Sequence, residues 1–222
     1  MTSSSNTKLV LASGSPRRAQ ILGEAGISLE IVPADIDEDA VFAAAMNGEL
    51  SAAVEALAFA KAKSIAETRV GEYVLGADTI VVLNDEVLGK PGSTEEAVSM
   101  LRRLNDRSHE VITGVAIVNP AGETHTNHVS TAVKFRRLDE DAIAEYVSSG
   151  SPFDKAGGYG IQDDSFDPVA SYDECYLNVV GLPMCVTSEL LEQSGFVLSG
   201  ALKCASHAVH NSDVGADEPG SL

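Results

Sequence analysis

The segment Tyr73–Leu83 restricts the fold of this 222-residue chain more than any other part of the sequence. It reads YVLGADTIVVL, an apolar run rich in β-branched residues with one acid, Asp78, near its middle. Apolar residues at alternate and neighbouring positions are typical of a strand buried within a sheet. A carboxylate in such a strand costs free energy unless it is paired, hydrogen-bonded or bound to a metal ion. Asp78 is therefore a candidate general base or metal ligand, although such an acid can also simply cap a neighbouring backbone group.

A second candidate site follows the short apolar strand Lys8–Leu11, in the turn Ser13–Arg18. Ser15 is a suitable N-cap and Pro16 a suitable first residue for a helix over Arg17–Gly26. Backbone N–H groups at a helix start, with two arginines beside them, favour the binding of an anion such as phosphate. The spacing excludes a Walker A loop. A helix start with two solvated arginines is the alternative interpretation.

Hydrophobic periodicity predicts the remaining elements and, with them, an α/β fold with a mixed sheet. Further strands are expected at Ile27–Val32, Glu86–Leu88, Glu110–Val118, Asn127–Phe135 and Asn178–Val180, the third and fourth as a hairpin. Further helices are expected at Leu50–Thr68, Ser93–Leu104, Asp139–Ser148 and Pro183–Ser194, with an irregular segment at Gly150–Gln162. We expect one domain over residues 8–200, a flexible N-terminus at 1–7 and a disordered tail at 201–222.

The charge balance excludes some classes of function. With 15 basic and 33 acidic residues the net charge is −18, and such a surface repels nucleic-acid backbones. Any phosphate chemistry therefore needs a local basic pocket. No apolar run is long enough to cross a membrane and no secretory signal is visible. The three cysteines are too few for a disulfide framework or a zinc site, which indicates a reducing cytoplasm.

Three further motifs carry chemistry-bearing residues, and each has a plainer interpretation. Lys90 follows a short strand and precedes a proline, as an exposed turn lysine would. Asp154 and Lys155 stand before a glycine-rich stretch that permits close approach of a ligand, or that is a flexible loop. The acidic loop Asp35–Asp39 offers oxygen ligands for a divalent ion, although acidic runs are more often solvated. The histidines show no metal-ligand spacing.

The order of these motifs along the chain is more specific than any one of them. Between Lys8 and Ser194 the chain resembles the Maf (septum formation inhibitor) family, through Leu11–Arg18, Gly76–Thr79, Gly89–Pro91, Thr113–Val115, Asp154–Gln162 and Asn178–Pro183. The resemblance implies an elongated mixed β-sheet flanked by helices, in two lobes around a central cleft. It implies a cytoplasmic, often homodimeric pyrophosphatase that cleaves nucleoside triphosphates between the α- and β-phosphates and needs a divalent metal ion, Mg²⁺ or Mn²⁺.

The resemblance also assigns roles to individual positions. Asp78 matches the proton acceptor and a metal ligand, and Glu38 is a possible second ligand. The positions that set substrate choice in the family correspond to Arg17, Thr79 and Gln162. Other polar residues are expected to line the cleft, namely Ser13, Arg18, Lys61, Lys90 and Lys155.

Substrate preference follows from two of these positions. Thr79 and Gln162 are similar to the branch that hydrolyses dTTP and UTP. The chain departs from the family pattern at Ser151, in the segment Asp163–Pro168 and at Tyr176–Leu177. Because these departures lie beside the expected base-reading part of the cleft, they bear on the preferred base more than on the reaction.

Three functional hypotheses follow. Hydrolysis requires charge neutralisation on the phosphates, an aligned water and a stabilised leaving group, and Asp78 with the cationic positions offers these. Nucleotidyl transfer would instead depend on an acceptor phosphate. A non-catalytic nucleotide-binding regulator of cell division would bind nucleotides without cleaving them. A buried acid in the central strand favours hydrolysis, because a binding protein has little need for Asp78.

Overall fold

One mixed β-sheet runs the length of the molecule in the computed structural model, which describes residues 8–46 and 48–198. Within these residues the sheet has seven strands in the order β2-β1-β3-β5-β6-β7, and β4 pairs with β3. The strands are β1 (Leu9–Leu11), β2 (Leu29–Ile31), β3 (Tyr73–Leu83), β4 (Glu86–Leu88), β5 (Ser108–Val118), β6 (Thr124–Phe135) and β7 (Val169–Tyr172). The first two strands run parallel to their neighbours and the other pairings are antiparallel. The predicted elongated mixed α/β sheet is thereby confirmed.

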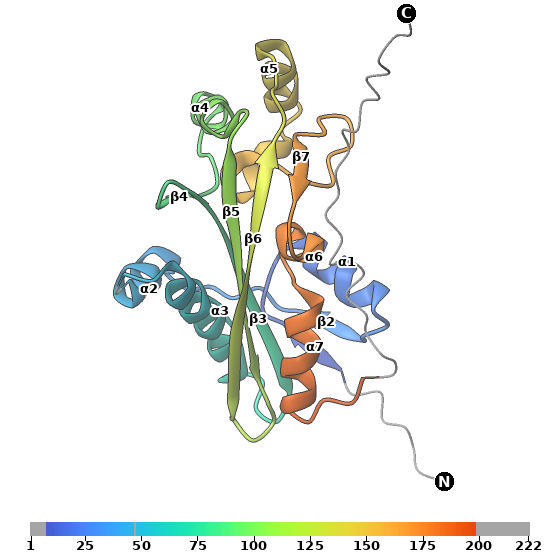
Figure 1. The fold of residues 1–222 in the computed structure, drawn as a ribbon. Helices are drawn as coiled ribbons and strands as arrows, with labels where there is room; N and C mark the ends of the chain where they lie inside the picture. Colours follow the sequence, from blue (N-terminus) through green and yellow to red (C-terminus); the bar gives the residue numbers. More distant parts are fainter. Residues whose placement is uncertain (1–7, 47, 199–222) are drawn as a thin grey trace, which may run out of the picture.

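Helices cover both faces of this sheet (Figure 1). They are α1 (Pro16–Glu24), α2 (Glu38–Ala45), α3 (Leu50–Ala66), α4 (Thr94–Leu104), α5 (Glu140–Ser148), α6 (Tyr176–Val180) and α7 (Met184–Gln193). Two short 3₁₀-helices, η1 (Ser151–Asp154) and η2 (Ala156–Gly158), lie in the segment predicted to be irregular. In Figure 1, α2 and α3 lie on one side of the long β5–β6 hairpin, and α1, α6 and α7 lie on the other.

The central strand β3 has a gap in its pairing along one edge. One edge pairs with β5 from Val74 to Val82, without interruption. The other edge pairs with β1 only as far as Leu75 and with β4 only from Val81 onward. Asp78 lies inside this gap. Because a strand edge without a neighbouring strand leaves backbone groups and side chains accessible, the sheet itself opens at the position of the acid.

The two faces of β3 have different surroundings. Even-numbered positions face α3, and odd-numbered positions face two apolar clusters on the opposite side of the sheet. One of these clusters contains Leu75 with α1 and α7, and the other contains Val81 with α4 and α5. Between them lie the hydroxyl groups of Thr79 and Thr113, which are register partners on β3 and β5.

Two glycines allow α3 to lie unusually close to the sheet. A Cβ atom at Gly76 would come within 2.2 Å of the Ala58 carbonyl oxygen, and one at Gly114 within 2.6 Å of the Val54 carbonyl oxygen. Gly114 is the register partner of Asp78. The glycines therefore bring the backbone of α3 against the strand that carries the acid.

Most elements agree with the sequence-based predictions, and the helix starts agree closely. Ser15 caps α1 with Pro16 as the first helical residue, Ser93 caps α4, and Asp139 caps α5. The Asn84–Asp85 turn between β3 and β4 has both residues at positive φ, as a two-residue hairpin requires. The predicted termini at 1–7 and 201–222 lie outside the described residues.

Three expectations were wrong or incomplete. The predicted strand Asn178–Val180 is part of helix α6, because Gly181 takes the left-handed φ of 118° that ends this short helix. The expected acidic loop is partly helical, since the Asp37 side chain accepts a hydrogen bond from the Ala40 amide and starts α2. Strand β7 (Val169–Tyr172) was not predicted, and it pairs with β6 through an irregular register.

A buried histidine lies in the second cluster, on β5. The His109 ring packs edge-on against Phe135 and Tyr159, and its Nε2 is 2.7 Å from the Tyr159 hydroxyl. Burial lowers the pKa of His109 to about 4, so the ring is neutral at pH 7.

No helix among residues 8–46 and 48–198 is long and apolar enough to cross a membrane.

Gly76→Ala should destabilise the protein by about 3 kcal/mol, because the new methyl group overlaps the backbone of α3. Gly23→Ala is the matched control: its site in α1 is open, so alanine should stabilise the helix by up to about 1 kcal/mol. Urea unfolding measures both. Equal stability of the Gly76→Ala variant and the wild type would contradict the close packing of α3.

The free energy of unfolding should fall as the pH falls from about 6.5 towards 4, because unfolded His109 binds a proton that the folded ring does not. The difference between the two pKa values corresponds to about 3 kcal/mol at the low end of this window. Denaturant titrations at pH 7, 6, 5 and 4 measure the slope. In His109→Gln this part of the slope should disappear, and an unchanged slope would contradict the assignment.

Candidate active site

A cavity of about 550 Å³ opens at the unpaired edge of β3. Because the edge is open, side chains from both faces of the strand reach it, and Asp78 and Thr79 line the same cavity. All ten site residues expected from the sequence line it: Ser13, Arg17, Arg18, Glu38, Lys61, Asp78, Thr79, Lys90, Lys155 and Gln162. Their assembly in one place is consistent with a single site, and their individual roles stay predictions.

Asp78 is held by an ion pair with α3. The Lys61 Nζ lies 2.6 Å from Asp78 Oδ1 and 2.9 Å from Glu38 Oε1, so one ammonium joins two carboxylates from different elements. The side chains of Lys61 and Asp78 are only 9% and 13% exposed, whereas that of Glu38 is 50% exposed. The close approach of α3 at Gly76 brings Lys61 to Asp78. The pair offsets the cost of burying the acid that the sequence predicted.

The donor set at this point suits a hard divalent cation. Glu38 and Asp78 contact the same positive group, so the two carboxylates lie on either side of the Lys61 ammonium. In the described part of the chain no group of three or more His, Cys, Asp or Glu side chains gathers in this way. Two carboxylates fit Mg²⁺ or Mn²⁺ when substrate phosphate oxygens and water complete the coordination.

Arg18 uses most of its donors within the protein. Its Nε donates to the Gly181 carbonyl at 2.8 Å, and its NH1 donates to Ser13 Oγ at 2.9 Å and to the Ala77 carbonyl at 2.8 Å. Its NH2 donates to Thr79 Oγ1 at 3.0 Å. Burial lowers the pKa of Arg18, and the nearby Asp78 carboxylate opposes this effect. The guanidinium therefore ties three parts of the cavity wall together and has little capacity left to grip a phosphate.

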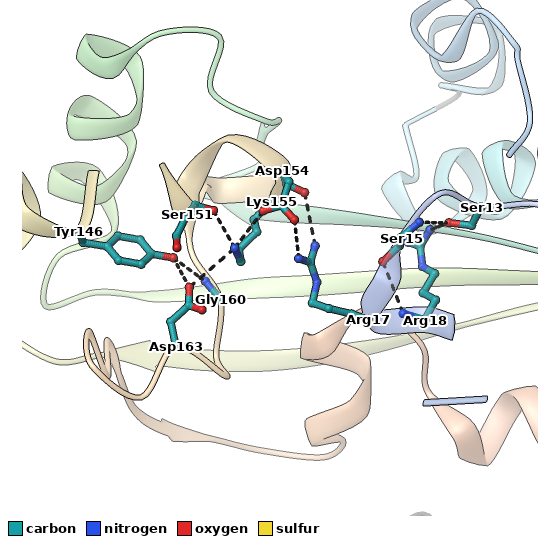
Figure 2. A network of polar contacts seen from close by, with 10 residues as sticks. All are labelled: Ser13, Ser15, Arg17, Arg18, Tyr146, Ser151, Asp154, Lys155, Gly160 and Asp163. Carbon is teal, nitrogen blue, oxygen red and sulfur yellow. Dashed lines mark hydrogen bonds and ion pairs between the residues drawn. The ribbon is translucent and has the colours of Figure 1, made fainter. Parts of the chain in front are cut away.

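Arg17 crosses from α1 to the opposite wall (Figure 2). Its NH1 lies 2.7 Å from Asp154 Oδ2, at the end of η1. Lys155 continues the network, with its Nζ 2.9 Å from Asp154 Oδ1, 2.7 Å from the Ser151 carbonyl and 3.8 Å from Asp163 Oδ2. Burial raises the pKa of Asp154, but the hydrogen bonds from Lys155 and Arg17 outweigh it and lower that pKa overall. Both cations therefore already have anionic partners.

Two predicted residues stand apart from this network. Lys90 is exposed and makes no ion pair with any residue that the structure describes, so its ammonium is available to a ligand. Gln162 is also exposed at the cavity rim, and its backbone carbonyl, not its side chain, accepts a hydrogen bond from the Asp164 amide. The side-chain amide of Gln162 can therefore turn towards a bound molecule.

The charge of the cavity differs from that of the protein as a whole. It is lined by five cationic side chains, Arg17, Arg18, Lys61, Lys90 and Lys155, and by four anionic ones, Glu38, Asp78, Asp154 and Asp163. Cations therefore outnumber anions by one in the wall of a protein whose net charge is −18. A bound divalent ion would add to this excess, which favours an anionic ligand.

Sequence reasoning missed several polar residues around the cavity. Thr113 and Asn178 are fully buried, and the Thr113 hydroxyl donates to the Asn178 carbonyl at 3.0 Å. The Asn178 side-chain amide donates to the Val111 carbonyl and to Thr131 Oγ1. Both residues lie in the motifs quoted above, but nothing in the local pattern shows that their side chains meet. The hydrogen bond between Tyr146 and Asp163 was missed for the same reason.

Relatives of known name match most of the chain. A dTTP/UTP pyrophosphatase of Moorella thermoacetica is 47% identical over 186 residues, which cover 83% of this chain and 94% of the relative. A dTTP/UTP pyrophosphatase of Symbiobacterium thermophilum is 46% identical over 189 residues, which cover 85% of this chain and 95% of the relative.

A solved structure, the Ham1 protein of Staphylococcus aureus, aligns with a TM-score of 0.42 and 17% identity over 73% of this chain and 80% of that one. This similarity is too low to support an argument about function. The family model described as Maf-like protein matches residues 8–194, which include every residue of the cavity wall. By this match, and by its identity to the two pyrophosphatases, the chain belongs to the Maf family.

Proposed function

We propose that this protein hydrolyses nucleoside triphosphates to a monophosphate and pyrophosphate, with dTTP and UTP as preferred substrates. The observation that carries the proposal is the ion-paired carboxylate of Asp78, which lies in the open edge of the central strand within a cavity lined by five cations. The two relatives with 46–47% identity are named dTTP/UTP pyrophosphatases, which supports both the reaction and the substrates.

In this reaction Asp78 acts as the proton acceptor. A water molecule attacks the α-phosphorus, the bond from this phosphorus to the bridging oxygen breaks, and the pyrophosphate departs with the electron pair. The Asp78 carboxylate accepts the proton of the attacking water. Lys61 keeps that carboxylate in place through the 2.6 Å contact between Nζ and Oδ1. No covalent intermediate with the protein is required.

The phosphates are held by groups at the ends of the cavity. The N-terminus of α1 offers backbone N–H groups after Ser15 and the positive end of the helix dipole. Lys90 makes no ion pair with a described residue, so its ammonium is available to a phosphate. Arg17 and Lys155 can do so when a phosphate takes over from Asp154.

Asp78 and Glu38 are the residues that would hold Mg²⁺ or Mn²⁺. When bound, the ion supplies neutralisation of phosphate charge and stabilises the pyrophosphate leaving group. The family resemblance further predicts a homodimer in the cytoplasm. Sedimentation of the purified protein tests the homodimer.

Asp78→Asn should lower kcat for dTTP hydrolysis by at least about a thousandfold, because the amide cannot accept the proton. Binding of dTTP should stay measurable. Pyrophosphate release in the presence of Mg²⁺ or Mn²⁺ measures the first effect and calorimetry the second. Asp85→Asn, at the exposed turn after the same strand, makes the same charge change and should keep wild-type turnover.

The controls for this experiment separate the competing functions. A fully active Asp78→Asn variant would reject the role of the acid. Wild-type protein that binds dTTP with saturation but releases no pyrophosphate with any divalent ion would favour a nucleotide-binding regulator. Turnover only after addition of an acceptor phosphate would favour a nucleotidyltransferase.

Lys90→Ala should lower kcat/KM for dTTP about tenfold or more, since an unpaired ammonium that neutralises phosphate charge is lost. Lys63→Ala removes the same charge from the exposed face of α3, away from the cavity, and should leave kcat/KM within a factor of about two. Initial rates over a range of dTTP concentrations measure both variants. Equal values for the two variants would contradict the assignment of Lys90 to the phosphate site.

A further inference from the structure

Two of the positions at which the chain departs from the family pattern contact the same lysine. The Lys155 Nζ lies 2.7 Å from the Ser151 carbonyl oxygen and 3.8 Å from Asp163 Oδ2. Its other partner is Asp154 Oδ1, at 2.9 Å. Figure 2 shows these three residues around the ammonium of a lysine that lines the cavity. The departures thus lie around a cation that is expected to bind phosphate.

The ammonium of Lys155 keeps one N–H group for a ligand. A lysine side chain carries three such donors. The Ser151 carbonyl and Asp154 Oδ1 accept two of them. Asp163 Oδ2 attracts the charge, but at 3.8 Å it is too far away to accept a hydrogen bond. The third donor therefore has no acceptor among the residues that the structure describes.

A hydrogen bond from Tyr146 holds the oxygen of Asp163 that faces this ammonium. A carboxylate only accepts, so the Tyr146 hydroxyl donates to Asp163 Oδ2. The Gly160 amide donates to the Tyr146 oxygen at 3.2 Å, which leaves the hydroxyl proton directed towards Asp163. Burial, together with the hydrogen bond to Asp163, raises the pKa of Tyr146, so the hydroxyl keeps its proton at pH 7.

Packing fixes both the tyrosine and the carboxylate. The buried Tyr146 ring stacks on Phe166, with 3.8 Å between the ring centroids and 3° between the planes. The backbone carbonyl of Asp163 accepts a hydrogen bond from the Phe166 amide at 2.9 Å. A Cβ atom at Gly160 would lie 2.8 Å from both Asp163 Oδ2 and Lys155 Cε, so the glycine leaves room for the two charged groups. These neighbours together set the distance between the carboxylate and the ammonium.

A shorter contact between these two groups would weaken the binding of a phosphate. If the Asp163 carboxylate moved to hydrogen-bond distance, it would occupy the free N–H group of Lys155. Asp154 competes for the same ammonium, but its side chain is exposed and regains water when a phosphate replaces it. Asp163 is less exposed, so a phosphate would displace it less readily.

We propose that Tyr146 is a positioning residue that keeps Asp163 from closing on Lys155, and that the ammonium thereby retains an N–H group for a phosphate of the substrate. The inference rests on the proposed function, in which Lys155 contacts phosphate. It concerns the phosphate chain that all nucleoside triphosphates share, so a change at Tyr146 should affect substrates with different bases equally.

Two substitutions test the restraint. Tyr146→Phe keeps the ring on Phe166 but removes the hydroxyl, so the Asp163 carboxylate becomes free to bond to Lys155. Adding Asp163→Asn removes the competing charge, because an amide oxygen binds an ammonium much more weakly than a carboxylate does. The second substitution should therefore reverse the effect of the first.

The matched controls lie outside the cavity wall. Tyr73→Phe removes the same atom from a ring that packs on Phe196. Tyr146→Phe combined with Asp164→Asn has the same net charge as the rescued variant, but the neutralised acid is the exposed neighbour of Asp163. Calorimetry with inorganic tripolyphosphate, without a divalent ion, gives Kd for each protein. Pyrophosphate release from dTTP and dCTP with Mg²⁺ gives kcat/KM.

Tyr146→Phe should raise Kd for tripolyphosphate about tenfold, because one charge-assisted contact to phosphate is lost. Its kcat/KM for dTTP and for dCTP should fall by the same factor. Addition of Asp163→Asn should restore Kd to the wild-type value or below it, whereas addition of Asp164→Asn should not. Tyr73→Phe should keep wild-type constants. A purely structural role of Tyr146 would give a loss of affinity that Asp163→Asn does not reverse.

Three results would overturn the inference. The first is an unchanged Kd for tripolyphosphate in a folded Tyr146→Phe variant. The second is a raised Kd that Asp163→Asn fails to restore. The third is a changed ratio of kcat/KM between dTTP and dCTP, which would connect this segment with the base instead. Failure of the proposed function looks different, since the wild type would then release no pyrophosphate while the tripolyphosphate measurements still decide the role of Tyr146.

Discussion

The gap in strand pairing along one edge of β3 is the constraint on which the site depends. β1 leaves this edge after Leu75 and β4 joins it only at Val81, while β5 holds the other edge throughout. The strand therefore stays rigid although its middle is exposed to a cavity. The Ala77 carbonyl, which has no strand partner there, is satisfied by Arg18. The arginine thus completes the sheet at the point where it opens.

The opening lets one strand serve two kinds of chemistry. Asp78 faces α3, which two glycines bring close enough for Lys61 to hold the carboxylate. Thr79 faces the opposite side, where it lies between two apolar clusters and its hydroxyl forms hydrogen bonds with Arg18 and Thr113. Adjacent residues that would normally be separated by the thickness of the sheet thus reach one cavity.

The charges of the cavity are arranged as ion pairs that a substrate would exchange. Arg17 and Lys155 both contact Asp154, and Lys61 bridges Asp78 and Glu38. Such pairs offset the cost of burying charge in the absence of ligand. A phosphate that replaces Asp154 would find cations already positioned, so little ordering is needed on binding. This arrangement resolves the conflict between a chain charge of −18 and an anionic substrate.

The sequence by itself determined the central strand, the caps of α1, α4 and α5 and ten of the residues that line the cavity, because these depend on local periodicity and on motifs in a fixed order. It did not determine α6, since Val179 and Val180 favour a strand locally and Gly181 with the packing of Asn178 overrides them. Only the tertiary structure decided which cations are already paired and that Arg18 is used within the cavity wall. Arg18, for example, bonds to Ala77 and Gly181, which lie 59 and 163 residues further along the chain, and no local pattern contains such contacts.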